Sequence, residues 1–160
     1  MDESLALQFE EITADDIQPL TRLMINAFDA DYRRHSGSDQ ACPEPFASGD
    51  FFRRWLVGCS DVGRYKICTK EALIGGIVVW LFEDERNILG SIFVDPAYQG
   101  HAVGQRAWQF VEATYPTTRR WTLSTPRWST KNHFFYEQRC GFHKVREERT
   151  TVVYAKDFEE

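Results

Sequence analysis

Residues 94–105, which read VDPAYQGHAVGQ, decide the fold. They join an apolar segment typical of a strand, 87–94, to an amphipathic segment typical of a helix, 102–115. Gly100 permits a sharp turn, and Gly104 is one of two small residues that leave backbone N–H groups accessible at the helix start. Such groups, together with the helix dipole, bind phosphate oxygens without a lysine. A plain glycine turn before a helix fits this stretch equally well.

Other classes of protein fit the chain poorly. A Walker A loop is excluded because no Gly-Lys-Ser/Thr follows the glycines, and the spacing of a dinucleotide GxGxxG is wrong. A net charge of -5 disfavours nucleic acid as a partner. The longest apolar run, 73–82, is shorter than the roughly 20 residues that span a bilayer. The acidic start lacks the layout of a signal peptide and the four cysteines lack CxxC spacing, so we expect a cytoplasmic protein without membrane contact.

Hydrophobic periodicity and turn residues predict one mixed α/β domain over residues 1–160. The predicted order is β-α-α-β-β-β-α-β-α-β-β, with a strand-to-helix crossover in the middle. The predicted strands are 8–12, 65–68, 72–82, 87–94, 121–125, 142–146 and 150–155. The predicted helices are one from Thr13 to about residue 34, a short one at 51–56, and those at 102–115 and 132–139, with a loop at 35–49.

A second informative segment is residues 132–142, which read NHFFYEQRCGF. Asn132 and Tyr136 are four residues apart and therefore lie on one helix face. That face can present an amide and a phenol to one cleft. The alternative is that Asn132 caps the helix while Tyr136 packs in the core.

Together, the two segments resemble those of the GNAT superfamily of N-acetyltransferases. The first is similar to that family's pyrophosphate loop, V-x-P-x-x-(Q/R)-G-x-G-x-G, with Ala102 in place of the middle glycine. We expect Ala102 to have a negative φ, which alanine accepts. The second is similar to its N-x-x-x-Y-E-K-x-G-F signature, with Gln138 in place of the lysine. The matched positions are Val94, Pro96, Gln99, Gly100 and Gly104, then Asn132, Tyr136, Glu137, Gly141 and Phe142.

The resemblance implies a mixed, mostly antiparallel sheet with a central splayed pair of parallel strands, flanked by helices. It implies acetyl-CoA as co-substrate, without a metal, between the strands that end near Val94 and Ser124. Pantetheine would pair with the backbone of 92–94, Asn132 would hydrogen-bond the same arm, and Tyr136 would protonate the departing thiolate. The implied cofactor residues are Ile92, Phe93, Val94, Gln99, Gly100, His101, Ala102, Val103, Gly104, Gln105, Asn132 and Tyr136.

The implied reaction is direct attack of an amine on the thioester, which needs an acceptor for the amine's proton. An alkyl amine has a pKa of about 10.4, so its neutral form costs about 4.6 kcal/mol at pH 7. In many relatives a carboxylate on the strand before the loop accepts this proton, but 87–93 contains none. Glu83 is therefore the first candidate for the base, ahead of Asp31 and Glu85, although each is also explained as a solvated surface charge.

We expect the first helix and the loop after it to form the acceptor site, with Phe28, Asp31 and Tyr32 as lining residues, although Phe28 also fits the core. The predicted function is transfer of an acetyl group to a primary amine of a small molecule or peptide. A non-catalytic acyl-CoA-binding or sensor module is the alternative, prompted by the missing strand carboxylate. A homodimer is left open.

Overall fold

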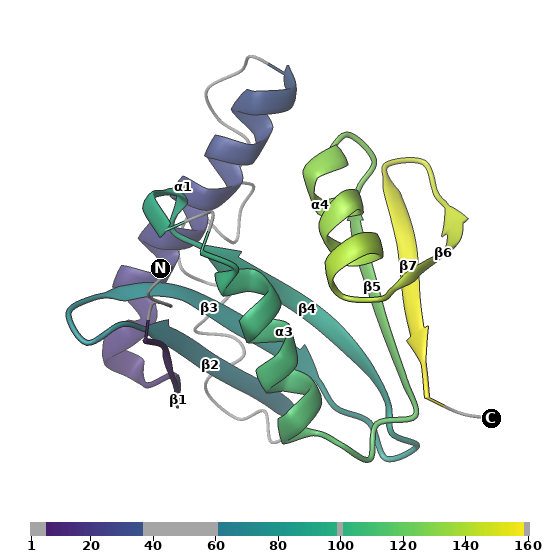
Figure 1. Cartoon of the computed structure of the whole chain (residues 1–160), viewed down its shortest axis with the longest axis horizontal. Helices are drawn as coiled ribbons and strands as arrows, with labels where there is room; N and C mark the ends of the chain where they lie inside the picture. The colour runs from purple at the N-terminus through teal and green to yellow at the C-terminus, as the bar shows by residue number, and fades with distance from the viewer. Residues whose placement is uncertain (1–5, 37–60, 99–100, 159–160) are drawn as a thin grey trace, which may run out of the picture.

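The computed structural model describes residues 6–36, 61–98 and 101–158. They form a seven-stranded sheet in the order β1-β2-β3-β4-β5-β7-β6 (Figure 1). The strands are β1 (Gln8–Glu11), β2 (Val62–Cys68), β3 (Leu73–Trp80), β4 (Arg86–Val94), β5 (Arg120–Pro126), β6 (His143–Glu147) and β7 (Thr151–Asp157). The helices are α1 (Ile17–Ser36), α3 (Val103–Thr114) and α4 (Thr130–Phe134), with the short turns η1 (Ala14–Asp16) and η2 (Pro96–Tyr98) and the π-helical turn η3 (Phe135–Arg139).

All neighbouring strands are antiparallel except β4 and β5, which are parallel. This confirms the predicted mixed, mostly antiparallel sheet with a central parallel pair. The parallel pairing covers only Arg86–Ile88 of β4 and Arg120–Thr122 of β5. Beyond these residues the two strands diverge toward their C-terminal ends (Figure 1).

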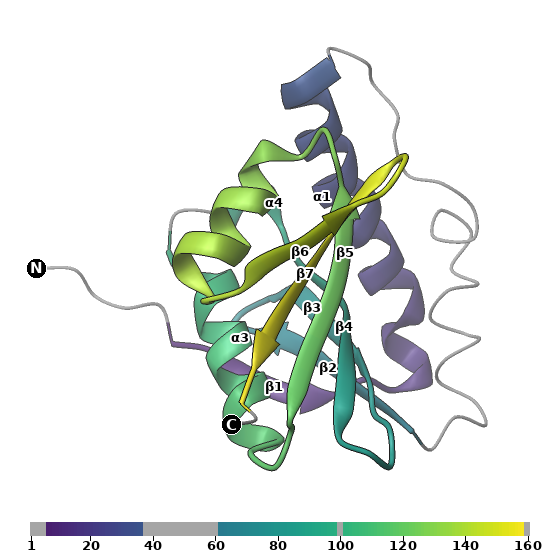
Figure 2. The same ribbon diagram turned by 90° about the vertical axis from the view of Figure 1, so that its right-hand side faces the viewer.

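β3 is buried on both sides because helices cover both faces of the sheet. Successive side chains of a strand point to opposite faces, so Val78 faces one helix layer while Ile77 and Val79 face the other. On the first face α1 contributes its buried apolar residues, and on the second α3 does so. Figure 2 shows α1 on one side of the sheet and α3 and α4 on the other. The divergence of β4 and β5 therefore opens between two packed layers.

A bulge lies in β4 just after the parallel pairing ends. Val78 pairs with Ser91 while the next residue, Val79, pairs with Leu89, so Gly90 is left over. A Cβ atom on Gly90 would lie 2.0 Å from the ring of Trp80. Only glycine fits here, and the bulge changes the direction of β4 where it separates from β5.

The elements differ from the sequence prediction mainly at helix ends. The first helix continues to Ser36 instead of giving way to a loop at residue 35. The rest of that loop and the predicted helix at 51–56 lie outside the described residues. The helical segment predicted at 132–139 begins at Thr130 and ends in the turn η3. Among the described residues, no helix has the length and apolar character needed to cross a membrane.

Candidate active site

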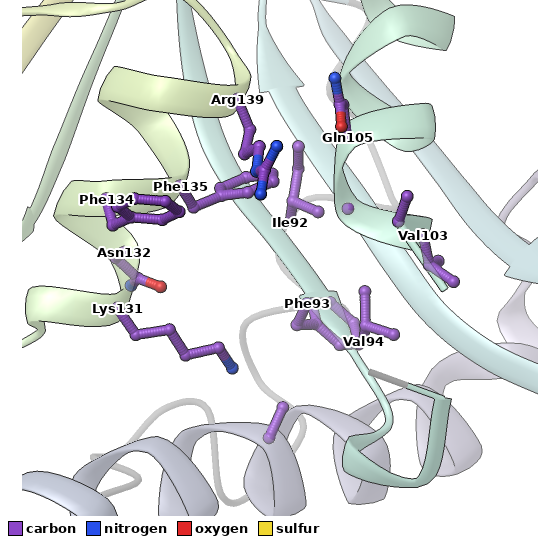
Figure 3. A pocket seen from close by; sticks show the side chains of 13 residues that line it. Ile92, Phe93, Val94, Val103, Gln105, Lys131, Asn132, Phe134, Phe135 and Arg139 are labelled. Carbon is purple, nitrogen blue, oxygen red and sulfur yellow. The ribbon is translucent and has the colours of Figure 1, made fainter. Parts of the chain in front are cut away.

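A cavity of about 600 Å³ lies where β4 and β5 diverge. Four parts of the chain form its wall: the end of β4, the start of α3, the α4–η3 segment and one turn of α1 (Figure 3). The lining residues are Ala27, Ile92, Phe93, Val94, Ala102, Val103, Gly104, Gln105, Lys131, Asn132, Phe134, Phe135 and Arg139. Most are apolar, and the polar ones are few, which is typical of a ligand pocket.

The end of β4 turns toward this pocket an edge that is not paired with β5. On one side, Ile92, Phe93 and Val94 pair with β3. On the other side, within the described part of the chain, pairing with β5 stops at Ile88. Unpaired N–H and C=O groups of a strand edge bind an extended partner by adding another strand. All three predicted β4 residues therefore lie where an amide-containing arm can pair with them.

The start of α3 forms the wall beside β4. Ala102, Val103, Gly104 and Gln105, four of the predicted cofactor residues, line the pocket, while His101 is exposed and is not a lining residue. Gln99 and Gly100 lie outside the described residues. The first N–H groups of a helix have no partner within the helix, so they are available to an anion here.

Ala102 is the N-cap of α3 and has φ 56° and ψ 28°, in the left-handed region. The prediction that its φ would be negative is therefore wrong. A left-handed conformation costs an L-residue roughly 1–2 kcal/mol, which glycine avoids. The alanine is thus a strained replacement for the glycine of the loop pattern.

Gly104 allows α3 to lie close to η3. A Cβ atom on Gly104 would sit 3.0 Å from Cζ of Phe135. This is closer than ordinary van der Waals contact, so any larger residue must move the ring or occupy the pocket.

Asn132 joins α4 to the end of β5. Its amide nitrogen donates a hydrogen bond to Oγ1 of Thr125 at 3.1 Å. Its carbonyl oxygen points toward the pocket (Figure 3). The side chain therefore presents an acceptor, suited to the N–H of an amide. The neighbouring His133 is held elsewhere, with Nε2 and the carbonyl oxygen of Pro126 3.0 Å apart.

Tyr136 does not line the pocket. It is 8 % exposed, belongs to the core and packs against Phe142 and Tyr154, with ring centroids 5.8 and 6.4 Å away. Phe135 takes the place on the pocket wall. This geometry favours the core-packing interpretation of Tyr136, and its role as general acid stays a prediction.

The turn η3 explains this placement. In the signature N-x-x-x-Y-E-K-x-G-F the glycine follows the tyrosine by four residues, whereas Gly141 follows Tyr136 by five. A π-helical turn holds more residues than an α-helical turn. The turn Phe135–Arg139 therefore accommodates one surplus residue. The match of Gly141 and Phe142 to the signature needs this one-residue shift.

The pocket lining includes two cationic residues that were not predicted from the sequence. Lys131 extends into it from α4, and Arg139 points into it from η3 (Figure 3). Lys131, Phe134 and Phe135 share one helix face because they are three and four residues apart. That spacing is visible in the sequence, but only the fold shows that this face lines the pocket.

The predicted base Glu83 is far from the pocket. It is exposed in the turn that precedes β4, and the neighbouring candidate Glu85 is half-buried in the same turn. Six residues separate Arg86 from Ile92, which is about 20 Å along a strand. The assignment of Glu83 as the base is therefore corrected. The side chains of Phe28, Asp31 and Tyr32, all on α1, lie outside the described part of the structure.

The ionisable groups of the described lining are both positive, and no carboxylate is among them. The nearby thiol of Cys140 is buried, and burial raises its pKa to about 12. It is protonated at neutral pH and is a poor nucleophile. No group of three or more His, Cys, Asp or Glu side chains in residues 6–36, 61–98 and 101–158 is arranged to hold a metal ion.

Solved structures share this fold. An acetyltransferase of Thermus thermophilus superposes with a TM-score of 0.79 at 18% identity, covering 97% of this chain and 99% of that one. The PaiA N-acetyltransferase of Thermoplasma acidophilum, solved in complex with coenzyme A, gives 0.77 at 13% identity and covers 96% and 100%. At these identities the likeness shows the fold.

Sequence comparison adds the family. The "Uncharacterized protein YrkN" of Bacillus subtilis (strain 168) is 37% identical over 82 residues, which are 51% of this chain and only 44% of that protein. A sequence profile of the acetyltransferase (GNAT) family matches residues 23–142, from the middle of α1 to the residue before β6. The match includes β4, the start of α3 and the α4–η3 segment that together enclose the pocket, and the chain belongs to the acetyltransferase (GNAT) family.

Proposed function

We propose that the protein transfers the acetyl group of acetyl-CoA directly to a primary amine. The observation that carries this proposal is the pocket at the divergence of β4 and β5. It offers the strand edge at Ile92–Val94, where β4 is not paired with β5, for the amides of pantetheine, and the N-terminal N–H groups of α3 for pyrophosphate. The coenzyme A complex of the PaiA enzyme, which has the same fold, supports this choice of cofactor.

In this reaction the amine nitrogen attacks the carbonyl carbon of the thioester, the C–S bond breaks, and the nitrogen loses a proton. The CoA thiolate that leaves takes up a proton. The described lining has no carboxylate, so we propose that the amine enters neutral or loses its proton to water. An alkyl amine pays about 4.6 kcal/mol for neutrality at pH 7, whereas an α-amino group of pKa about 8 requires only about 1.4 kcal/mol.

The walls contribute apolar contacts. Phe134, Phe135, Val94 and Ala27 present apolar surface to the ligand. An unsolvated thiolate is costly. The apolar pocket therefore favours breakage of the C–S bond together with protonation of the sulfur atom. Asn132, fixed to Thr125, orients the arm through its carbonyl oxygen.

Release of CoA thiol from acetyl-CoA in the presence of an amine panel tests the proposal. The panel should contain alkyl amines, amino acids and short peptides with a free N-terminus, since one protein of this fold is the ribosomal-protein-S18-alanine N-acetyltransferase of Escherichia coli. Amine-dependent thiol release with an acetylated product would support the enzyme. Tight binding of acetyl-CoA with no amine-dependent turnover, even in a single turnover, would favour the sensor alternative.

A further inference from the structure

Arg139 is a cation held at the pocket wall. It is the last residue of η3, and its Cζ atom lies 5.6 Å from the ring centroid of Phe134. Its guanidinium group points into the pocket on the side of Gln105 of α3 (Figure 3). Within the described residues it makes no ion pair, so its hydrogen-bond donors are available to a ligand.

The turn η3 gives Arg139 this position. Phe135 and Arg139, the first and last residues of the turn, both line the pocket, whereas Tyr136 between them turns to the core. π-helical turns are rare and occur frequently at functional sites. Here the turn ends at Arg139, so a guanidinium forms part of the pocket wall.

Coenzyme A carries two kinds of phosphate. The pyrophosphate is accounted for by the N–H groups at the start of α3 in the proposed function. The 3′-phosphate is a monoester with a charge near -2 at neutral pH, so a cationic side chain near it would stabilise its binding. Guanidinium suits it because two parallel N–H groups bind two phosphate oxygens at once.

Of the two cations in the lining, Arg139 is the better placed. Lys131 extends toward α1 and Val94, at the inner end of the pocket (Figure 3). Arg139 faces Gln105, the third residue of α3, beside the helix start to which the proposed function assigns pyrophosphate. We propose that Arg139 binds the 3′-phosphate of the cofactor, so that the protein discriminates between coenzyme A and 3′-dephospho-coenzyme A. This rests on the proposed function.

Calorimetric titration of the full chain with each of these two ligands tests the inference. In the Arg139→Gln variant, Kd for coenzyme A should rise by about tenfold or more, the size expected for lost charge-assisted hydrogen bonds. Kd for 3′-dephospho-coenzyme A should change less than twofold, which also shows that the variant is folded. Arg146→Gln is the matched control, since Arg146 is exposed on β6 and its Nε lies 3.3 Å from Glu148 Oε2. It should leave both constants unchanged.

An equal loss of affinity for both ligands would overturn the inference, because Arg139 would then contact a part that they share or merely support the wall. Unchanged Kd values for both would also overturn it. If the unmodified protein bound neither ligand, the proposed function itself would fail. If the unmodified protein bound coenzyme A and 3′-dephospho-coenzyme A with the same Kd, only the role of Arg139 would be refuted.

Discussion

The rings of Phe135 and Tyr136 lie 5.1 Å apart, and only that of Phe135 reaches the pocket. Tyr136 is directed into the core by the π-helical turn that begins one residue earlier. The phenol that the signature leads one to expect beside the thioester is therefore not part of the described wall. A phenylalanine cannot donate a proton, so this position of the lining offers no acid.

Removing the hydroxyl of Tyr136 tests this arrangement. Because the ring packs in the core, Tyr136→Phe should lower kcat less than threefold and leave the Kd of acetyl-CoA unchanged. Steady-state kinetics with chemistry shown to be rate-limiting is the measurement. A loss of 10²–10⁴-fold in kcat, the usual effect of removing a positioned acid, would instead establish Tyr136 as the general acid.

Glu83 should be catalytically silent. It lies about 20 Å along β4 from the pocket, so Glu83→Gln should keep kcat/KM within twofold of the unmodified enzyme from pH 6 to about 9.5. Without a carboxylate base, kcat/KM should rise with pH toward the pKa of the acceptor amine. Asp31→Asn, measured in parallel, tests the remaining candidate on α1. If either variant lost a pKa from its pH profile of kcat/KM, the substituted residue would be identified as the base.

Gly104→Val should block the cofactor site. Its Cβ atom meets the ring of Phe135, and its methyl groups must enter the pocket. At a hundredfold excess over Kd, acetyl-CoA should stabilise the unmodified protein by about 2.7 kcal/mol, and the variant should show no such shift in Tm. Gln109→Val, at an exposed position of the same helix, is the control and should keep the full shift. A full shift in the Gly104 variant would place the loop outside the site.

Ala102→Gly should stabilise the protein. The change removes the cost of a left-handed alanine, about 1 kcal/mol, and should raise Tm by roughly 2–4 °C. Ala113→Gly, at an exposed helical position of α3, should act in the opposite direction because glycine lowers helix stability. Differential scanning calorimetry of both variants gives the comparison. A lower Tm for Ala102→Gly would show that the left-handed conformation is not strained.

The buried thiol of Cys140 predicts a loss of stability at alkaline pH. Its pKa is about 12 in the folded chain and about 8.5 when unfolded, so between these values the folded state holds a proton that the unfolded state has lost. The free energy of unfolding should therefore fall as pH rises from about 9 toward 12. Cys140→Ala should be less stable at pH 8, because it leaves a cavity, but should show a shallower decline. Parallel denaturant titrations at pH 8 and 10.5 measure this, and equal slopes would contradict it.

Much of the fold could be predicted because the signals are local. Alternating apolar residues mark β3 and β4, and the small residues after Pro96 mark the turn into α3. The parallel pair β4 and β5 was implied by the family resemblance, and the helix between the two strands agrees with it. These features depend on the residues within each segment, and the structure confirms them.

The missed features depend on packing between segments. The sign of φ at Ala102 is set by how α3 meets β4, and either sign fits a small residue in the sequence. Lys131 of α4 and Arg139 of η3 face the pocket because of the way the α4–η3 segment packs in the fold. Counting at 3.6 residues per turn also misplaced Tyr136, because a π-helical turn follows another period. Glu83 is different, since an antiparallel β3–β4 pair already places their connecting turn away from the end of β4.

The short parallel contact between β4 and β5 has a mechanical consequence. The seven strands form two units, β1 to β4 and β5 to β7, whose hydrogen-bonded seam is three residue pairs long. An arm bound along Ile92–Val94 would prolong that seam and brace the two units against each other. Each cycle of cofactor binding and release would then stiffen and relax the middle of the sheet, so the cofactor would serve as a removable strand as well as a reactant.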